Sequence, residues 1–264
     1  MTMEVDILEL SERSAKFILS NANASFANGI RRAALSDVPT LAIDDVNIYN
    51  NTSVLFDEQL ALRLALTPLT TDIEEFVPAE ECTCGSECPA CKVSLTLSAE
   101  GPRMVYSGDL VSSDANVQPA DQHVPIIDLK EGQKVVLEAI ARMGYGHDHA
   151  KWQAGVACGY KNMPVVRFEN CDQCGACVSE CPQGIIHIGQ NGAEISGDDI
   201  LKCILCKLCA SVCEIDAITV SEDENTFIFS MESDGSYTVQ QLIINAGTTI
   251  KEKASRLGQI LESL

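Results

Sequence analysis

Two stretches of the chain, CDQCGACVSECP at residues 171–182 and CILCKLCASVCE at residues 203–214, repeat one pattern of cysteines. In each stretch two residues separate the first three cysteines from one another, and the fourth cysteine follows after three more residues. Apolar residues follow both stretches at matching offsets, Ile186 and Ile188 in the first repeat and Ile218 and Val220 in the second. We therefore expect a compact module in which each half is a ligand loop, a short helix and a strand.

This spacing resembles that of bacterial-type ferredoxins, in which three cysteines of one run and the last cysteine of the other hold each 4Fe–4S cluster. Glu214 replaces the proline that follows the first run, but this change removes no ligand. A degenerate module that no longer binds iron is the main alternative, and the presence of every expected cysteine argues against it. The predicted ligands are Cys171, Cys174, Cys177 and Cys213 for the first cluster, and Cys203, Cys206, Cys209 and Cys181 for the second.

A second group of cysteines, Cys82, Cys84, Cys88 and Cys91, lies in a short loop rich in small and acidic residues. Four thiolates so close in sequence predict a tetrahedral zinc site that pins the loop. The Cys-x-Cys start is tighter than usual zinc spacing, so free thiols or an oxidised pair remain alternatives. Cys158 is left over, and we assign it no role beyond that of a small buried side chain.

The composition limits the class of function. The chain has 264 residues, 46% of them apolar, and a formal net charge of −20. Such a charge repels phosphate backbones, so we expect little or no direct nucleic-acid contact and partners with basic surfaces. The acidic start, MTMEVDILEL, is not a signal peptide, and no apolar run is long enough to span a membrane. We therefore expect a cytoplasmic protein, and in that reducing environment a total of thirteen cysteines indicates metal or cluster binding rather than disulfides.

Periodicity predicts the remaining elements. Residues 3–7 alternate like a half-buried strand, and a second strand is expected at 15–20. A helix should run from Phe26 to about Ser36, capped by Ser25. The other expected elements are extended segments at 41–49, 93–99, 103–107 and 124–128, a helix at 58–66, a candidate helix at 131–143, and a hairpin around Asp234-Gly235.

The chain ends in an expected helix over 238–262 with an apolar stripe that includes Leu242, Ile243, Ile250 and Leu257. Such a stripe either packs on its own domain or forms half of a subunit interface. Two clusters usually indicate an electron relay, but we find no dinucleotide-binding glycine loop, haem attachment sequence or catalytic triad.

The flanks of the cysteine module carry a further resemblance. Residues 26–35 (FANGIRRAAL), continuing through 38–43 (VPTLAI), resemble the alpha motif of DNA-directed RNA polymerases. Residues 146–153 (GHDHAKWQ) resemble the His-Ala-Lys-Trp signature of the archaeal, D-type branch of that alpha family and of its eukaryotic third-subunit counterpart. The loop at 82–91 is similar to the zinc loop of the same branch. The chain is thus identified as a member of this family with a two-cluster ferredoxin-like insert.

This resemblance implies an α+β fold in three parts. They are a discontinuous dimerisation domain at 1–46 and 223–264, a second α+β domain at 47–166, and a ferredoxin-like domain at 167–222. It also implies a non-catalytic assembly subunit of a nucleotidyltransferase, which pairs with the smaller subunit L to nucleate the enzyme and whose clusters stabilise or regulate assembly.

The resemblance further implies a set of interface residues, Phe26, Ile30, Arg31, Arg32, His149, Lys151 and Trp152, together with the four stripe residues of the terminal helix. For Trp152, a core or lid position is the alternative. The rival function for the whole chain is an iron–sulfur electron-transfer protein or oxidoreductase subunit.

Overall fold

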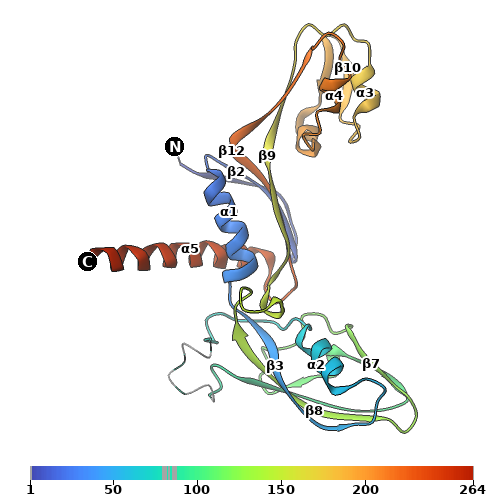
Figure 1. Cartoon of the computed structure of the whole chain (residues 1–264), viewed down its shortest axis with the longest axis vertical. Helices are drawn as coiled ribbons and strands as arrows, with labels where there is room; N and C mark the ends of the chain where they lie inside the picture. Colours follow the sequence, from blue (N-terminus) through green and yellow to red (C-terminus); the bar gives the residue numbers. More distant parts are fainter. Residues whose placement is uncertain (1, 79–81, 83, 85–87, 264) are drawn as a thin grey trace. The chain divides into compact units, whose positions relative to one another are not determined.

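The computed structural model describes residues 2–78, 82, 84 and 88–263, which form two compact units that both mix helices and strands (Figure 1). The predicted α+β class is thus confirmed. Unit 1 comprises the described residues up to Leu8, Lys16–Ala27 and Tyr160–Phe229. Unit 2 comprises Glu9–Ala15, Asn28–Gly159 and the described part of Ser230–Leu264. Within the described residues, no helix combines the length and apolar character needed to cross a membrane.

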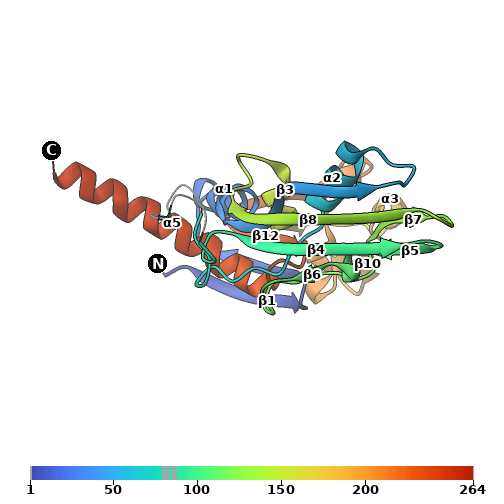
Figure 2. The same cartoon turned by 90° about the horizontal axis from the view of Figure 1, so that it is seen from below.

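Unit 2 is built on an antiparallel sheet with the strand order β3-β8-β4-β6 (Figure 2). Its strands are β3 (Thr40–Asn51), β8 (Lys134–Gly144), β4 (Val93–Glu100) and β6 (Val111–Ser112). A second pair joins β5 (Arg103–Tyr106) to β7 (Pro125–Leu129), and helix α2 (Asp57–Ala65) contributes Leu60 and Leu64 to the core between these layers. The turn η2 (Ser107–Asp109) follows β5.

The candidate helix at 131–143 is wrong, because residues 134–144 form strand β8. Val135, Leu137, Ala139, Ala141 and Met143 are all buried at every second position, which is the period of a strand. Because β8 pairs with β3 on one side and β4 on the other, it lies in the middle of the sheet and buries more than an edge strand would.

Most of a second four-stranded sheet belongs to unit 1, with the order β1-β2-β12-β9. The strands are β1 (Glu4–Leu10), β2 (Ser14–Ser20), β12 (Ile218–Ser233) and β9 (Gly155–Phe168). Phe17 of β2 stacks on Phe229 of β12 with ring centroids 5.0 Å apart. The strand predicted at 3–7 is confirmed as β1, but its predicted half-burial is wrong: all seven residues of β1 are exposed, because β1 is an edge strand whose apolar side chains are uncovered.

Helix α1 (Ala24–Arg32) continues into η1, a π-helix (Ala33–Asp37) that ends before Pro39. The cap differs from the prediction, because the backbone N–H of Phe26 donates to Oδ1 of Asn23 at 2.8 Å. Asn23 therefore takes the capping role assigned to Ser25.

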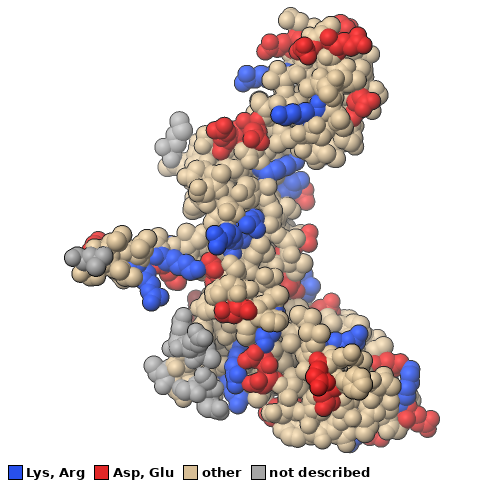
Figure 3. Space-filling model, in the orientation of Figure 1, with Lys and Arg blue, Asp and Glu red and all other residues tan. Residues whose placement is uncertain are grey.

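Helix α5 (Val239–Glu262) confirms the predicted terminal helix. The hairpin expected around Asp234-Gly235 is wrong, because β12 runs on to Ser233 and a short turn leads directly to Thr238, which caps the helix. Val239, Leu242 and Ala246 are buried, whereas nearly every residue from Lys251 onward is exposed. That half of the helix stands out from the rest of unit 2 and carries Lys and Arg side chains (Figures 1 and 3).

The cysteine module of unit 1 has two similar halves, as predicted. The first contains α3 (Ala176–Glu180) followed by β10 (Ile186–Gly189), which pairs with β11 (Gly192–Ile195). The second contains η4 (Gly197–Lys202) and α4 (Leu208–Ser211), followed by β12. Ile185, Ile186 and Ile218 form its small core together with several of the cysteines.

Candidate metal centres

The two ligand loops share one backbone geometry. Gln173 and Leu205, which precede the second cysteine of each run, both have a positive φ, of 62° and 57°. Gly175 and Lys207, which follow that cysteine, have φ of 79° and 61°. Left-handed residues on both sides of a cysteine curl the chain tightly, and only glycine adopts this conformation without strain. The repeat in sequence is therefore also a repeat in conformation.

The first predicted ligand set comes together in space. Burial, followed by the nearby thiolates of Cys171, Cys174 and Cys213, raises the pKa of the Cys177 thiol. Backbone N–H groups also point at the sulfurs: Ala193 N lies 3.3 Å from Cys171 Sγ, and Ala217 N lies 3.3 Å from Cys213 Sγ. Cys213 thus approaches the cysteines of the other run, as the crossed ligand pattern requires.

The second set lines a cavity in the module. Its walls include Cys181, Cys203, Cys206 and Cys209, with Ile185 and Ile186. Burial, followed by the Cys203, Cys206 and Cys181 thiolates, raises the pKa of the Cys209 thiol. Eight thiols thus gather in two groups of four, one residue of each group coming from the opposite run, and this donor set fits two 4Fe–4S clusters.

One residue near this second group was not found by sequence reasoning. Lys161 of β9 donates from Nζ to the backbone carbonyl oxygens of Leu201 and Cys203, both at 2.7 Å. Burial lowers its pKa, while the neighbouring Cys203 thiolate opposes that shift. No pattern links Lys161 to residues about forty positions away, so only the fold reveals the contact.

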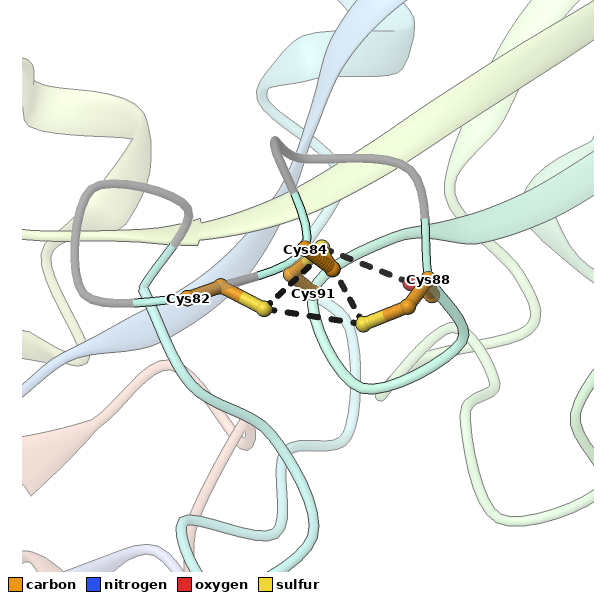
Figure 4. A group of neighbouring side chains, drawn as sticks. All are labelled: Cys82, Cys84, Cys88 and Cys91. Atoms are coloured by element: carbon orange, nitrogen blue, oxygen red, sulfur yellow. Dashed lines mark hydrogen bonds between the residues drawn. The ribbon is translucent and has the colours of Figure 1, made fainter.

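The group at residues 82–91 forms a separate centre in unit 2 (Figure 4). The four sulfur atoms of Cys82, Cys84, Cys88 and Cys91 all lie within 4.8 Å of one another. The Sγ–Sγ distances are 3.6 Å for Cys82–Cys88, 3.5 Å for Cys84–Cys91 and 3.7 Å for Cys88–Cys91, while Cys82–Cys84 is shorter at 3.0 Å. A tetrahedron of sulfurs about 2.3 Å from a zinc ion has edges of about 3.8 Å, so three of these distances fit a zinc site closely. Residues 79–81, 83 and 85–87 lie outside the described residues.

The His-Ala-Lys-Trp segment includes the turn η3 (Ala150–Trp152), which lies against β3 and contacts β8 through Trp152. Lys151, whose side chain is only 11% exposed, forms an ion pair with Asp44 at 2.5 Å and lies 4.3 Å above the Trp152 ring. Burial opposes ionisation of Asp44, but hydrogen bonds and charges from Lys151 and Arg142 outweigh it and hold the Asp44 pKa below its usual value.

Trp152 is also fixed by contacts with its own chain. Its Nε1 donates to the carbonyl oxygen of Arg142 at 3.1 Å, and its ring covers Gly144, where an added Cβ would lie 2.5 Å from Cδ2. Lys151 and Trp152 therefore fasten this segment to their own chain, while His149 stays exposed with its ring edge-on to Trp152.

The remaining predicted interface residues differ in exposure. On α1, Phe26, Ile30 and Arg31 are half-buried and Arg32 is exposed; Arg31 donates from Nε and Nη2 to Asn28 Oδ1. On α5, Leu242 is fully buried, Ile243 and Ile250 are half-buried and Leu257 is 58% exposed. Cys158 is half-buried, and burial raises its pKa to about 11, which describes an inert thiol.

Comparisons with known proteins agree with these features. Residues 46–158 match the family described as RNA polymerase Rpb3/RpoA insert domain, and residues 170–218 match the 4Fe-4S dicluster domain. The chain is 65% identical to the DNA-directed RNA polymerase subunit Rpo3 of Methanosarcina acetivorans and of Methanosarcina mazei, and 40% identical to that of Archaeoglobus fulgidus. Each alignment covers 100% of both chains.

Proposed function

Because the chain belongs to the archaeal family of DNA-directed RNA polymerase subunits named Rpo3, we propose that it is a non-catalytic platform on which the polymerase assembles, through a heterodimer with the smaller subunit L. The rival interpretation as an electron carrier or oxidoreductase subunit is not favoured, because the relatives that match over the full length are polymerase subunits. The match over the whole chain carries the proposal.

The proposed dimer surface is the apolar side of the projecting half of α5 together with residues 28–32 of α1, which belong to the same unit. Leu257, Ile260 and Leu261 are 58%, 52% and 60% exposed, which is unusual for three large apolar side chains within five residues of one helix. Ile250 would extend this surface within unit 2, and Phe26 of unit 1 remains a separate proposed contact. Leu242 is excluded from it, because its own chain already buries it completely.

The proposed division into domains keeps the boundaries expected from sequence. A dimerisation domain at 1–46 and 223–264 would bracket a second domain at 47–166 and an iron–sulfur domain at 167–222. The matched ranges, 46–158 and 170–218, support these two inserted parts. Arg31, Arg32 and His149 remain proposed contacts with neighbouring subunits, whereas the proposal for Lys151 and Trp152 is weakened by their intrachain bonds.

We propose that the module holds two 4Fe–4S clusters and that the loop at 82–91 holds one zinc ion. The grouping of the eight module thiols supports the first, and the Sγ–Sγ distances support the second. Bound iron and zinc would supply cross-links that these small segments need in order to fold. Anaerobic purification followed by metal analysis should give about eight iron atoms and about one zinc per chain.

The platform role is tested by co-expression with subunit L. Leu257→Asp should weaken or abolish the heterodimer, because a charge replaces an apolar contact, without lowering the stability of the chain alone. Leu62→Asp is the matched control, since Leu62 is equally exposed, at 57%, but lies on α2. Normal pairing by the Leu257 variant would argue against the α5 surface, and failure of the wild-type chain to pair with L would overturn the platform proposal itself.

A further inference from the structure

Lys161 makes an unusual pair of contacts at the start of the second ligand loop. Its ammonium lies 2.7 Å from the carbonyl oxygens of both Leu201, in the last turn of η4, and Cys203, the first predicted ligand of the loop. An ammonium has three N–H donors, so two of them are used on this one segment. The side chain is half-buried, and its stem comes from β9, outside the ligand loops.

We propose that Lys161 is a positioning residue of the second iron–sulfur site, which fixes the Cys203 loop and raises the reduction potential of the cluster bound there. This inference rests on the proposed presence of two clusters. A cluster gains negative charge when it accepts an electron, so a nearby cation favours its reduced form. Local charge and hydrogen bonds are among the main determinants of such potentials.

The other lysine beside Cys203 provides a natural contrast. Lys202 precedes this ligand in sequence, but its Nζ pairs with Asp199 Oδ1 at 2.7 Å and its side chain is 62% exposed. Its charge is therefore largely neutralised and screened by water. Lys161 instead directs its charge at backbone carbonyls of the ligand loop. The first site differs, because within the described part of the chain the hydrogen bonds to its first ligand, Cys171 Sγ, come from the backbone N–H groups of Gln173 and Ala193, at 3.4 and 3.3 Å, and not from a lysine.

A mediated redox titration of the anaerobically purified chain, followed by electron paramagnetic resonance, tests the proposal. The mediators supply the one electron that each cluster accepts. Lys161→Met should lower one of the two midpoint potentials, with an about tenfold change in the reduction equilibrium, or 59 mV for a one-electron couple. The other midpoint should stay unchanged. Lys161→Arg should keep the affected midpoint potential close to the wild-type value, because arginine retains the positive charge and the N–H donors.

Two further variants complete the design. Cys206→Ser removes or alters only the second cluster and so identifies its signal. Lys202→Met is the matched control and should move neither midpoint. If Lys161→Met instead loses the second cluster, it should keep about four of the eight iron atoms, while Lys161→Arg keeps all eight. This selective loss of iron would support the positioning role of Lys161.

Unchanged midpoints in a fully loaded Lys161→Met chain would overturn the inference and leave the two-cluster proposal intact. An equal shift of both midpoints would also overturn it. A wild-type chain with fewer than two clusters after anaerobic purification would instead overturn the proposed cofactor content, and the inference with it.

Discussion

Replacing Lys151 by methionine tests whether the His-Ala-Lys-Trp segment fastens unit 2 together. The substitution keeps an unbranched apolar stem but removes the ammonium that pairs with Asp44 and covers Trp152. A hydrogen bond to a charged group contributes about 1.5–3 kcal/mol, and a cation over an aromatic ring about 0.5–2 kcal/mol. Because Arg142 still pairs with Asp44 at 3.1 Å, we expect a loss near the lower end of the sum, about 2–3 kcal/mol.

Urea unfolding followed by tryptophan fluorescence measures this loss, since Trp152 is the only tryptophan of the chain. With a slope of about 2–3 kcal/mol per molar urea, the midpoint of the Trp152 transition should fall by about 1 M. Lys130→Met is the matched control: Lys130 pairs with Asp128, but their side chains are 70% and 46% exposed, so the change should stay below about 1 kcal/mol. Adding Asp44→Asn to both the wild type and Lys151→Met completes a double-mutant cycle for the ion pair.

The same contact predicts a pH dependence. The folded-state pKa of Asp44 is lowered, so its contribution is fully present above the unfolded pKa, near 3.8, and is lost as the pH falls through the folded value. The difference between wild type and Lys151→Met should therefore persist at pH 7 and shrink below about pH 4. Equal midpoints for the Lys151 and Lys130 variants at pH 7 would refute the reasoning and return Lys151 to a role in subunit contact.

Other substitutions test the metal module and the core. Gly192→Ala should cost the chain its first cluster, about four iron atoms by iron assay, because Gly192 has a φ of 133° and a new Cβ would lie 2.9 Å from the Cβ of Cys171. Gly175→Ala should destabilise the loaded module by about 1–2 kcal/mol through backbone strain alone, since its φ is 79° and the space around it is open. A thermal melt of the anaerobically purified chain measures this loss, and Gly159→Ala, in open space without a positive φ, should leave that melt unchanged. Leu242→Ala should cost about 2–5 kcal/mol in the Trp152 unfolding assay, because the leucine is fully buried; a loss below about 1 kcal/mol would place it at the surface instead.

Sequence reasoning succeeded where the pattern is local. The spacing of the module cysteines predicted which of them belong together; this ligand assignment stays a prediction, which the thiols that surround Cys177 and Cys209 support. The apolar period of the terminal helix was equally clear. The sequence did not show which part of the stripe is buried. Leu242 is buried in the core and Leu257 is exposed, and this difference depends on how the rest of unit 2 packs against the helix.

The sequence did not predict features that depend on residues far apart in the chain. Residues 134–144 can form a helix or a strand on their own, and pairing of β8 with both β3 and β4 selects the strand. The contact from Lys161 to the Cys203 loop spans 42 residues and follows no periodicity. Asn23 caps α1 although Ser25 was an equally good candidate, because the choice depends on where the first helical turn begins.

The composition of the module core explains how iron could matter without any electron transfer. Its buried core contains Cys177 beside a few apolar residues such as Ile186 and Ile218, and five more of the eight predicted ligands are partly buried against that core: Cys171, Cys181, Cys203, Cys209 and Cys213. A segment of about fifty residues is already short of apolar area for independent stability. When metal removal turns its central residues into free thiols or thiolates, little holds the two ligand loops together. If the module holds the proposed clusters, iron supply would therefore control whether this part of the chain folds, and this would connect iron or oxygen status to polymerase assembly without electron transfer.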